Sequence, residues 1–355
     1  MTALARVRPG NRWRLRMWLF LGKVVPSAEL ANLSFIHVAS WSLVRRRSSL
    51  WDGHLLFISN FSGDSDEYIA NFADVVPTRI TRSFGLCDGF PGAQPSVGFI
   101  AFERSHDFPA SVYYSAFRNQ TVRDIGLYLR VNAHVDALQK AADSGSVDGF
   151  CEAYNATLEE VHERAPRRIT VRQRVWLVLA SWRPARRMHS VTAMLTLKKD
   201  GSGAALDAAT VSDALRALAE VVTDVFDKVG GTHFARFVQL PDAAPDSLLF
   251  SAQVDGRPKP YVARLCKAIL ERPELAAVFA LCEGWPGDRP RRLERWLRQF
   301  MVPAQLLIAG NRQASVGEIL RARDRTVVFL EFAGKHQSSP GQQLLDAFRA
   351  EVESR

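Results

Sequence analysis

Apolar residues recur at helical spacing over one long stretch in the second half of the chain. Val211, Leu215 and Leu218 are three or four positions apart, and the run ends at Gly230-Gly231. This spacing places the apolar side chains on one face of a helix, and glycine is common directly after a helix end. The pattern predicts an amphipathic helix from about residue 207 to residue 229.

A different pattern, strict alternation of apolar and polar residues, marks the region near the N-terminus. Residues 12–20 alternate between arginine and large apolar side chains over their first half and stay mostly apolar after that. Alternation is typical of a half-buried strand, whereas a helix lying on a membrane surface would place its arginines on one face. The pattern therefore favours an edge or half-buried strand, with a membrane-surface helix as the alternative.

The same two periodicities, with turn residues between them, place the other elements. Strands are predicted at about 34–44, 54–60, 97–102 (a short strand or buried segment), 111–117, 191–197, 232–240, 247–254 and 304–309. Helices are predicted at 64–76, after a Thr121 cap, at 132–165 with a break at Ser144-Gly145-Ser146, at 258–271, at 290–301 and at 342–352. The order strand, helix, strand, strand, helix, strand is that of a ferredoxin-like unit.

The two halves of the chain repeat one another in order and spacing. His37 and His233 occupy equivalent strands, and both halves later reach a Leu-Cys-acid-Gly-aromatic-Pro-Gly string, at 86–92 and at 281–287. In a true repeat, insertions fall in loops while positions inside elements keep step. The ordered matches therefore indicate an internal duplication.

The duplication predicts an α+β fold of two ferredoxin-like (βαββαβ) units, packed as a pseudo-twofold α+β barrel with a helical connector. The first repeat is expected to cover 11–131 and the second 190–333. A mainly helical connector at 132–189 and a C-terminal helix or tail at 334–355 complete the predicted organisation.

Composition narrows the class of the protein and of its partners. A hydrophobic fraction of 47% over 355 residues is enough for a full core, so the chain is expected to be globular. Its net charge of +9 favours an acidic partner such as nucleic acid or anionic lipid. The basic patches at 45–47, 167–174 and 183–187 lack the interleaved aromatics of an RNA-binding sheet, which disfavours nucleic acid. Trp176 and Trp182 better suit a membrane surface or a helix docked on the barrel.

Cysteine usage indicates the compartment. The four cysteines form no CxxC pair and no signal peptide precedes them, which favours a reduced compartment. Cys87 and Cys282 occupy equivalent positions and are expected to be small buried residues. No apolar run approaches the roughly 18 residues of a membrane-spanning helix. We expect a cytoplasmic protein, with attachment at the membrane periphery as an option.

Three strings of the first half resemble a poorly characterised group of bacterial proteins. They are FIHVASWSLV, LLFISNFSGDSDEYIANFADVV and FPASVYYSAFRNQTVRDI. The second half keeps the His-Phe-Ala-Arg-Phe strand and the Asp255-Gly256 strand end of that group better than the first half does. The resemblance covers about two thirds of the chain. It implies tandem ferredoxin-like units and brings no activity with it.

At the level of fold, tandem ferredoxin-like halves resemble the dye-decolourising peroxidases. Residues 85–89 match the Gly-x-x-Asp-Gly string of that family, whose acid assists peroxide cleavage beside haem; the resemblance gives this role to Asp88 and, in the second copy, to Glu283. The family holds its haem iron with a histidine of the second half. His233 and His336 stand in no haem-ligand context, so a structural turn around Asp88 is the other interpretation.

Paired histidines are the main candidate site. In a duplicated barrel His37 and His233 could face one cavity with Asp88 or Glu283, which predicts a haem, metal or acid–base site. Alternatively, each histidine is bonded to a neighbouring backbone carbonyl. Arg236 has no arginine partner in the first copy, so it predicts either an asymmetric anion contact or an ion pair.

The absence of several catalytic motifs disfavours whole classes of enzyme, and two functions remain. No glycine-rich phosphate loop, HExxH, GxSxG or zinc-ligand spacing occurs, which disfavours kinases, hydrolases and zinc enzymes. The sequence therefore predicts a small-molecule-binding protein whose ligand is apolar or haem-like; if it is an enzyme, it is a haem-dependent, peroxidase-like oxidoreductase. The alternative is a non-catalytic interaction protein that forms homo-oligomers or attaches to anionic membrane. A ligand site should differ between the copies at its cavity positions, whereas a scaffold should differ mainly in its loops.

Overall fold

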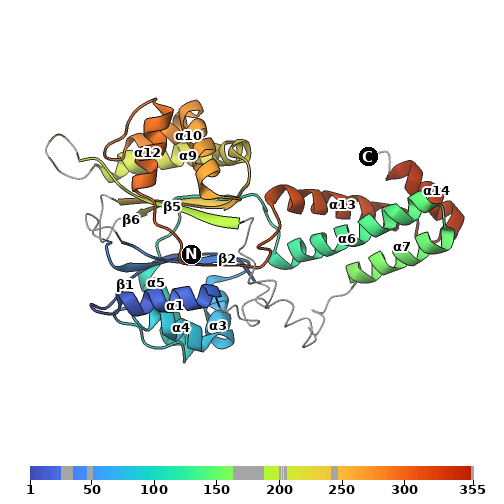
Figure 1. Cartoon of the computed structure of the whole chain (residues 1–355), viewed down its shortest axis with the longest axis horizontal. Helices are drawn as coiled ribbons and strands as arrows, with labels where there is room; N and C mark the ends of the chain where they lie inside the picture. Colours follow the sequence, from blue (N-terminus) through green and yellow to red (C-terminus); the bar gives the residue numbers. More distant parts are fainter. Residues whose placement is uncertain are drawn as a thin grey trace.

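Two sheets and the helices around them make up the protein. The computed structural model describes residues 1–24, 35–45, 51–162, 188–199, 201, 203, 206–240 and 247–352. Within these ranges the chain forms 12 helices and two four-stranded antiparallel sheets. Figure 1 shows the sheets as two inner layers between two outer layers of helices, with a helical module at one end.

The first sheet has the strand order β1-β3-β2-β8. Its strands are β1 (Thr2–Arg6), β2 (Ile36–Leu43), β3 (His54–Phe61) and β8 (Leu306–Ala309). Four helices pack on its outer face: α1 (Arg12–Val24), α3 (Ser65–Val75), α4 (Pro77–Phe84) and α5 (Ser96–His106). The core beneath them is rich in stacked and edge-to-face aromatic rings, which hold these helices on the sheet.

The second sheet has the order β4-β6-β7-β5 and a matching helical cover. Its strands are β4 (Val112–Ser115), β5 (Met188–Thr196), β6 (Thr232–Leu240) and β7 (Ser247–Asp255). The covering helices are α9 (Ala208–Val229), α10 (Pro258–Glu271), α11 (Pro273–Ala280) and α12 (Pro290–Gln299). The predicted helix at 207–229 is confirmed, since its apolar stripe lies buried against this sheet.

The last strand of each half belongs to the sheet of the other half. β4, from the first half, pairs with β6 so that Tyr114 lies opposite Ala235. β8, from the second half, pairs with β2 so that Leu307 lies opposite Ser40. The predicted α+β class is confirmed. The predicted barrel of two complete ferredoxin-like units is not confirmed, because neither half completes its sheet from its own strands.

The inner faces of the sheets meet in a mixed layer. One part is an apolar cluster to which both halves contribute: Leu4, Val44, Trp51, Leu56, Ile58, Met194, Val238, Leu240, Leu249 and Val302. The other part is polar, and there Asn60 Nδ2 of β3 donates to Gln253 Oε1 of β7 at 3.0 Å. The sheets are thus joined by both hydrophobic burial and hydrogen bonds.

Four helices form a module beside the sheets. They are α6 (Val122–Ser144), α7 (Val147–His162), α13 (Val316–Lys335) and α14 (Gly341–Glu351), and they share one core (Figure 1). Capping boxes at Thr121 and Ser315 start α6 and α13, and Gly145 in the left-handed conformation ends α6. The predicted helices at 132–165, as far as residue 162, and at 342–352 are confirmed, as are the Thr121 cap and the break at 144–146; residues 163–165 lie outside the described residues. The helical segment after the first repeat therefore packs with the helices that follow β8.

Two predicted strands are wrong. Residues 12–20 lie in α1, where Leu15 and Leu19 are buried on one helical face. Residues 97–102 lie in α5, where Phe99 and Phe102 are buried three positions apart. In both segments the helix is favoured because its buried positions, at intervals of three or four, all reach the same core. β1, α4, α11 and the 20-residue helix α13 were not predicted.

The other predicted strands and helices are confirmed, with each end within three residues of the prediction. Trp176, Trp182 and the basic stretches 167–174 and 183–187 lie outside the described residues. None of the helices within the described ranges is long and apolar enough to cross a lipid bilayer.

Candidate functional site

Arg236 lies in the polar part of the layer between the sheets. It is 3% exposed, and its Nη1 donates to Met1 O at 2.7 Å and to Thr2 Oγ1 at 2.9 Å. Its Nη2 donates to Ser59 O at 3.1 Å and to Asn60 Oδ1. Burial lowers the pKa of this guanidinium. Four protein acceptors thus occupy the two terminal nitrogens, so Arg236 ties β6 to β1 and β3 instead of presenting a cation to a ligand.

His233 is also bound within the protein. Its Nε2 lies 2.8 Å from Asp255 Oδ1, and the ring is fully buried at the start of β6. The other oxygen of Asp255 accepts from Val316 N at 3.0 Å, at the beginning of α13. The pair therefore fixes the helical module to the second sheet.

His37, the equivalent residue of β2, has a hydroxyl partner. Its Nε2 lies 3.0 Å from Ser62 Oγ, and its ring lies 5.3 Å from the ring of Phe234. Burial lowers the pKa of His37 to about 4, with His233 adding a smaller effect in the same direction. The imidazole is therefore neutral at pH 7. The structure brings the two histidines to the same end of the facing sheets, as the duplication predicts.

The two candidate acids lie at the other end of the sheets. Asp88 N donates to Arg6 O at the end of β1, and Glu283 N donates to Thr196 O at the end of β5, each at 2.8 Å. Both side chains are exposed. Strand β3 runs from His54, opposite Arg6, to Phe61, opposite Ile36, so a strand length separates Asp88 from His37. A shared histidine–carboxylate site at these positions is not formed.

These arrangements do not fit an axial haem ligand. The Nε2 atoms of His37 and His233 already face Ser62 and Asp255, and neither histidine lines the cavities described below. Within the part of the chain that the structure describes, no cluster of three or more His, Cys, Asp or Glu side chains could hold a metal ion. Burial raises the pKa of Cys87 and Cys282 to about 12, so these thiols stay protonated.

Glu103 on α5 is another buried ionisable residue. It is inaccessible to solvent, and neither of its carboxyl oxygens has a hydrogen-bond partner among the described residues. Burial, and secondly the nearby Asp107, raise its pKa to about 8. A carboxyl group in this setting is protonated at neutral pH.

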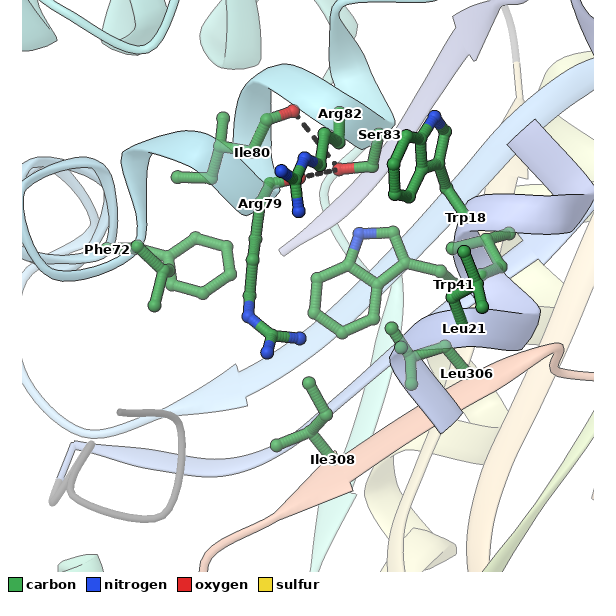
Figure 2. A pocket seen from close by; sticks show the side chains of 13 residues that line it. Trp18, Leu21, Trp41, Phe72, Arg79, Ile80, Arg82, Ser83, Leu306 and Ile308 are labelled. Atoms are coloured by element: carbon green, nitrogen blue, oxygen red, sulfur yellow. Dashed lines mark hydrogen bonds between the residues drawn. The ribbon is translucent and has the colours of Figure 1, made fainter. Parts of the chain in front are cut away.

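A cavity of about 240 Å³ opens between α1, α4 and the β2–β8 edge of the first sheet; we call it the α1–α4 pocket (Figure 2). Its walls are mainly apolar, and they come from both halves of the chain because β8 supplies Leu306 and Ile308. The residues that line it are Trp18, Leu19, Leu21, Gly22, Trp41, Phe72, Val76, Arg79, Ile80, Arg82, Ser83, Leu306 and Ile308.

A few polar groups border this pocket. Trp41 is 4% exposed, and its indole N–H is buried with no hydrogen-bond partner among the described residues. Figure 2 shows the indole nitrogen of Trp41 turned toward Arg82 and Ser83, whereas the side chain of Arg79 runs along the other side of the pocket and its guanidinium ends near Ile308. The guanidinium of Arg82 lies 4.7 Å from the centre of the Trp18 ring. Two cations and one unpaired donor thus border an apolar cavity.

The second copy lacks both arginines. When the copies are aligned without gaps on their Leu-Cys-acid-Gly strings, Arg79 corresponds to Glu274 and Arg82 to Ala277. The alignment is supported by burial, because the intervening Ile80 corresponds to the equally buried Leu275. The two copies therefore differ at cavity positions within a shared framework, the pattern expected of a ligand site.

Trp41, one of the two tryptophans of the pocket, is also particular to the first copy. Aligned on the two histidines, Trp41 corresponds to Phe237. Phe237 packs with its ring centre 5.7 Å from that of Phe279, inside the core beneath α9. The second copy thus replaces an unpaired donor by an apolar ring.

A second cavity, of about 420 Å³, lies between β4, α9 and the start of α13. Its polar groups pair with one another. Tyr114 Oη donates to Asp227 Oδ1 at 2.6 Å, and Arg118 donates to Thr223 Oγ1. This cavity presents satisfied polar groups, unlike the α1–α4 pocket.

None of the residues of the α1–α4 pocket was predicted from the sequence as a site residue. Two signals could have indicated them: the three-residue spacing of Arg79 and Arg82, and their replacement by Glu274 and Ala277 in the other copy. Comparison with protein-family models, with curated proteins and with solved structures gives no match for this chain. Its function is therefore inferred from the geometry of the pocket.

Proposed function

We propose that the protein binds a small apolar anion, a carboxylate with a hydrocarbon or aromatic body, in the α1–α4 pocket. The observation that carries the proposal is the buried, unpaired indole N–H of Trp41 in a pocket that two arginines also line. A buried donor without a partner costs about 1–3 kcal/mol, which an acceptor on a ligand would offset. Carboxylates are favoured partners of guanidinium groups because both are planar and bidentate.

The size and walls of the pocket support the rest of the proposal. Its volume of about 240 Å³ lies below the roughly 300–1,000 Å³ of pockets for drug-sized ligands, which favours a smaller molecule. Apolar walls from Trp18, Phe72, Leu306 and Ile308 favour a hydrocarbon body over a sugar or nucleotide.

Binding is favoured over catalysis at this pocket. None of the described residues that line it is a histidine, cysteine, lysine, aspartate or glutamate. The hydroxyl of Ser83 donates to the carbonyls of Arg79 and Ile80, at 3.0 and 3.2 Å, so no base activates it. We infer a carrier or sensor of apolar anions.

The two halves have matching element orders, which bears on the origin of the fold. Each half begins strand, helix, strand, strand, and the orders β1-β3-β2 and β5-β7-β6 match. We infer that the halves are ferredoxin-like units of one ancestor whose final strands have been exchanged. This exchange supports the pocket, because β8 reaches the first sheet only through it.

The test is a calorimetric titration of the purified chain with octanoate and, as an uncharged probe with the same body, 1-octanol. We expect Arg82→Ala, which copies the second half, to weaken octanoate binding about tenfold, because hydrogen bonds to charged groups contribute about 1.5–3 kcal/mol. Octanol binding should stay unchanged. Arg216→Ala, which removes an exposed arginine of α9, is the matched control.

Trp41→Phe, the residue of the second copy, tests the donor separately and should weaken octanoate about threefold or more. The proposal is contradicted if octanoate does not bind saturably, or if it binds the Arg82→Ala and Trp41→Phe chains as tightly as the natural one. A melting curve of each variant checks that the fold is retained.

A further inference from the structure

Helix α1 has two apolar faces. Leu15 and Leu19 point inward and are buried against the first sheet. On the opposite face Trp13 and Phe20 are 64% and 61% exposed, with Met17 between them. Positions 13, 17 and 20 lie on one side of a helix because they are four and three residues apart. The exposed side chains Trp13, Met17, Phe20 and Leu21 form what we call the α1 outer face.

Exposed apolar side chains are concentrated on this helix. In the part of the chain that the structure describes, nine large apolar residues are exposed, and four of them form the α1 outer face. Single exposed apolar residues are ordinary, whereas a contiguous group with two aromatic rings marks an interaction surface. Figure 1 shows α1 in the outer helical layer of the first half, and none of the other described elements is drawn over it in this view.

Positive charge borders the outer face on both sides. At about 100° per residue, Arg14 and Arg16 fall on opposite flanks of the stripe that contains Trp13 and Met17. Both arginines are exposed, and the sequence of α1 contains no acidic residue. An apolar stripe between cationic flanks is typical of a helix that lies in the interface of an anionic bilayer.

We propose that the α1 outer face docks on an anionic lipid membrane. The aromatic rings would lie at the level of the acyl boundary, where tryptophan is favoured, and the arginines would meet the head groups. The net charge of +9 adds a general attraction to such a surface.

A second copy of the chain is a less suitable occupant. A twofold contact through the outer face would place the arginines of one α1 near those of the other, with no acid on either helix to offset them. Arg12, the remaining arginine of the helix, already pairs with Asp52 of its own chain at 2.9 Å. Anionic lipid satisfies both the apolar and the cationic parts of the surface.

The docking surface and the α1–α4 pocket share a wall. Leu21 belongs to the outer face, and it also lines the pocket with Trp18 and Gly22. Docking would bring the pocket next to the lipid phase, in which apolar carboxylates dissolve. This connection rests on the proposed function, whereas docking itself does not.

The test is co-sedimentation of the full chain with vesicles of equimolar phosphatidylglycerol and phosphatidylcholine, and with vesicles of phosphatidylcholine alone. We expect binding to the anionic vesicles only, weakening as salt is added. Trp13→Ala combined with Phe20→Ala should reduce the bound fraction at least about tenfold, because two large apolar side chains no longer enter the bilayer. Arg14→Gln with Arg16→Gln should cause a loss of similar size at low salt.

The matched control is Val327→Ala with Leu330→Ala, which removes two exposed apolar side chains from α13. It should leave vesicle binding unchanged.

Equal binding to both vesicle types overturns the proposal, and so does an equal loss of vesicle binding in the control variant. Gel filtration adds one more overturning outcome: a natural oligomer that the Trp13/Phe20 variant dissociates, without vesicle binding, would make the face a protein interface. The octanoate titration of this variant should be unchanged, which separates a failure of docking from a failure of the pocket.

Discussion

At the scale of single residues, the carboxyl group of Glu103 makes the stability of the first half depend on pH. Burial raises its pKa from 4.5 to about 8. Between these values the folded protein keeps a proton that the unfolded chain has released, so the free energy of unfolding falls as pH rises. The stabilisation is complete below about pH 4.5 and is lost as pH rises through about 8.

We expect Glu103→Gln to flatten this dependence. The variant carries no titratable group at the site, so at about pH 9 its free energy of unfolding should exceed that of the natural chain by on the order of 1–3 kcal/mol. Urea unfolding at about pH 5 and about pH 9 measures the difference. Glu283→Gln, which alters an exposed acid, should leave the dependence as it is. Parallel slopes for Glu103→Gln and the natural chain would show that this carboxyl is not protonated in the fold.

The sequence indicated that His37 and His233 are equivalent residues, but it did not indicate their hydrogen-bond partners. The duplication singled out His37 and His233, and the structure does place them at one end of the sheets. Which atoms they meet depends on where loops and neighbouring helices end, as with Asp255 between β7 and α13. Arg236 shows the same limit, since nothing in its spacing distinguishes a buried tie between sheets from an exposed cation.

At the scale of elements, α1 shows why alternation misled the prediction. Arginines at 12, 14 and 16 alternate with apolar residues, which is also what a helix with two apolar faces and charged flanks produces. Only the burial of Leu15 and Leu19, against exposed Trp13, separates the two cases. The helices with one apolar face, such as α9 and α10, were predicted because the spacing of their apolar residues fits a helix and does not fit a strand.

The capping box of α13 offers a test at this scale. Ser315 Oγ accepts from Glu318 N at 3.3 Å, and the Glu318 side chain accepts from Ser315 N at 2.8 Å. We expect Ser315→Ala to lower the free energy of unfolding by about 1 kcal/mol, because it removes a cap from the helix that anchors the module. Urea unfolding measures the loss. Ser212→Ala, inside α9, should not lower stability, and a similar loss there would remove the cap as the cause.

At the scale of the whole molecule, each half is incomplete because β4 and β8 pair in the sheet of the other half. Most strands and helices along the chain can be predicted from periodicity, although β1, α4, α11 and α13 were missed and α1 and α5 were taken for strands. The pairing of strands cannot be predicted in this way, because β4 and β8 are four residues long and their sequences do not indicate which sheet edge they join. A repeat in sequence therefore predicted two separate units, whereas the structure has two shared sheets.

We expect residues 1–162 expressed alone to aggregate or self-associate, because the first sheet then lacks β8 and β4 has no β6 to pair with. Co-expression with residues 163–355 should restore a one-to-one complex, seen by gel filtration with mass measurement. Two fragments that are each monomeric and cooperatively folded would contradict the exchange. The control is the intact chain carried through the same procedure.

The pairing of β8 with β2 also affects how the first sheet can form during synthesis of the chain. β2 begins at Ile36, yet its partner β8 begins only at Leu306, so β2 is made long before β8. Until then one edge of β2 carries free amide and carbonyl groups, the kind of edge to which other chains add strands. Domains usually fold as their segments emerge, but here the first sheet cannot be completed before β8 has been made. The unpaired edge of β2 therefore exposes the nascent chain, more than the finished protein, to unwanted strand pairing with other chains.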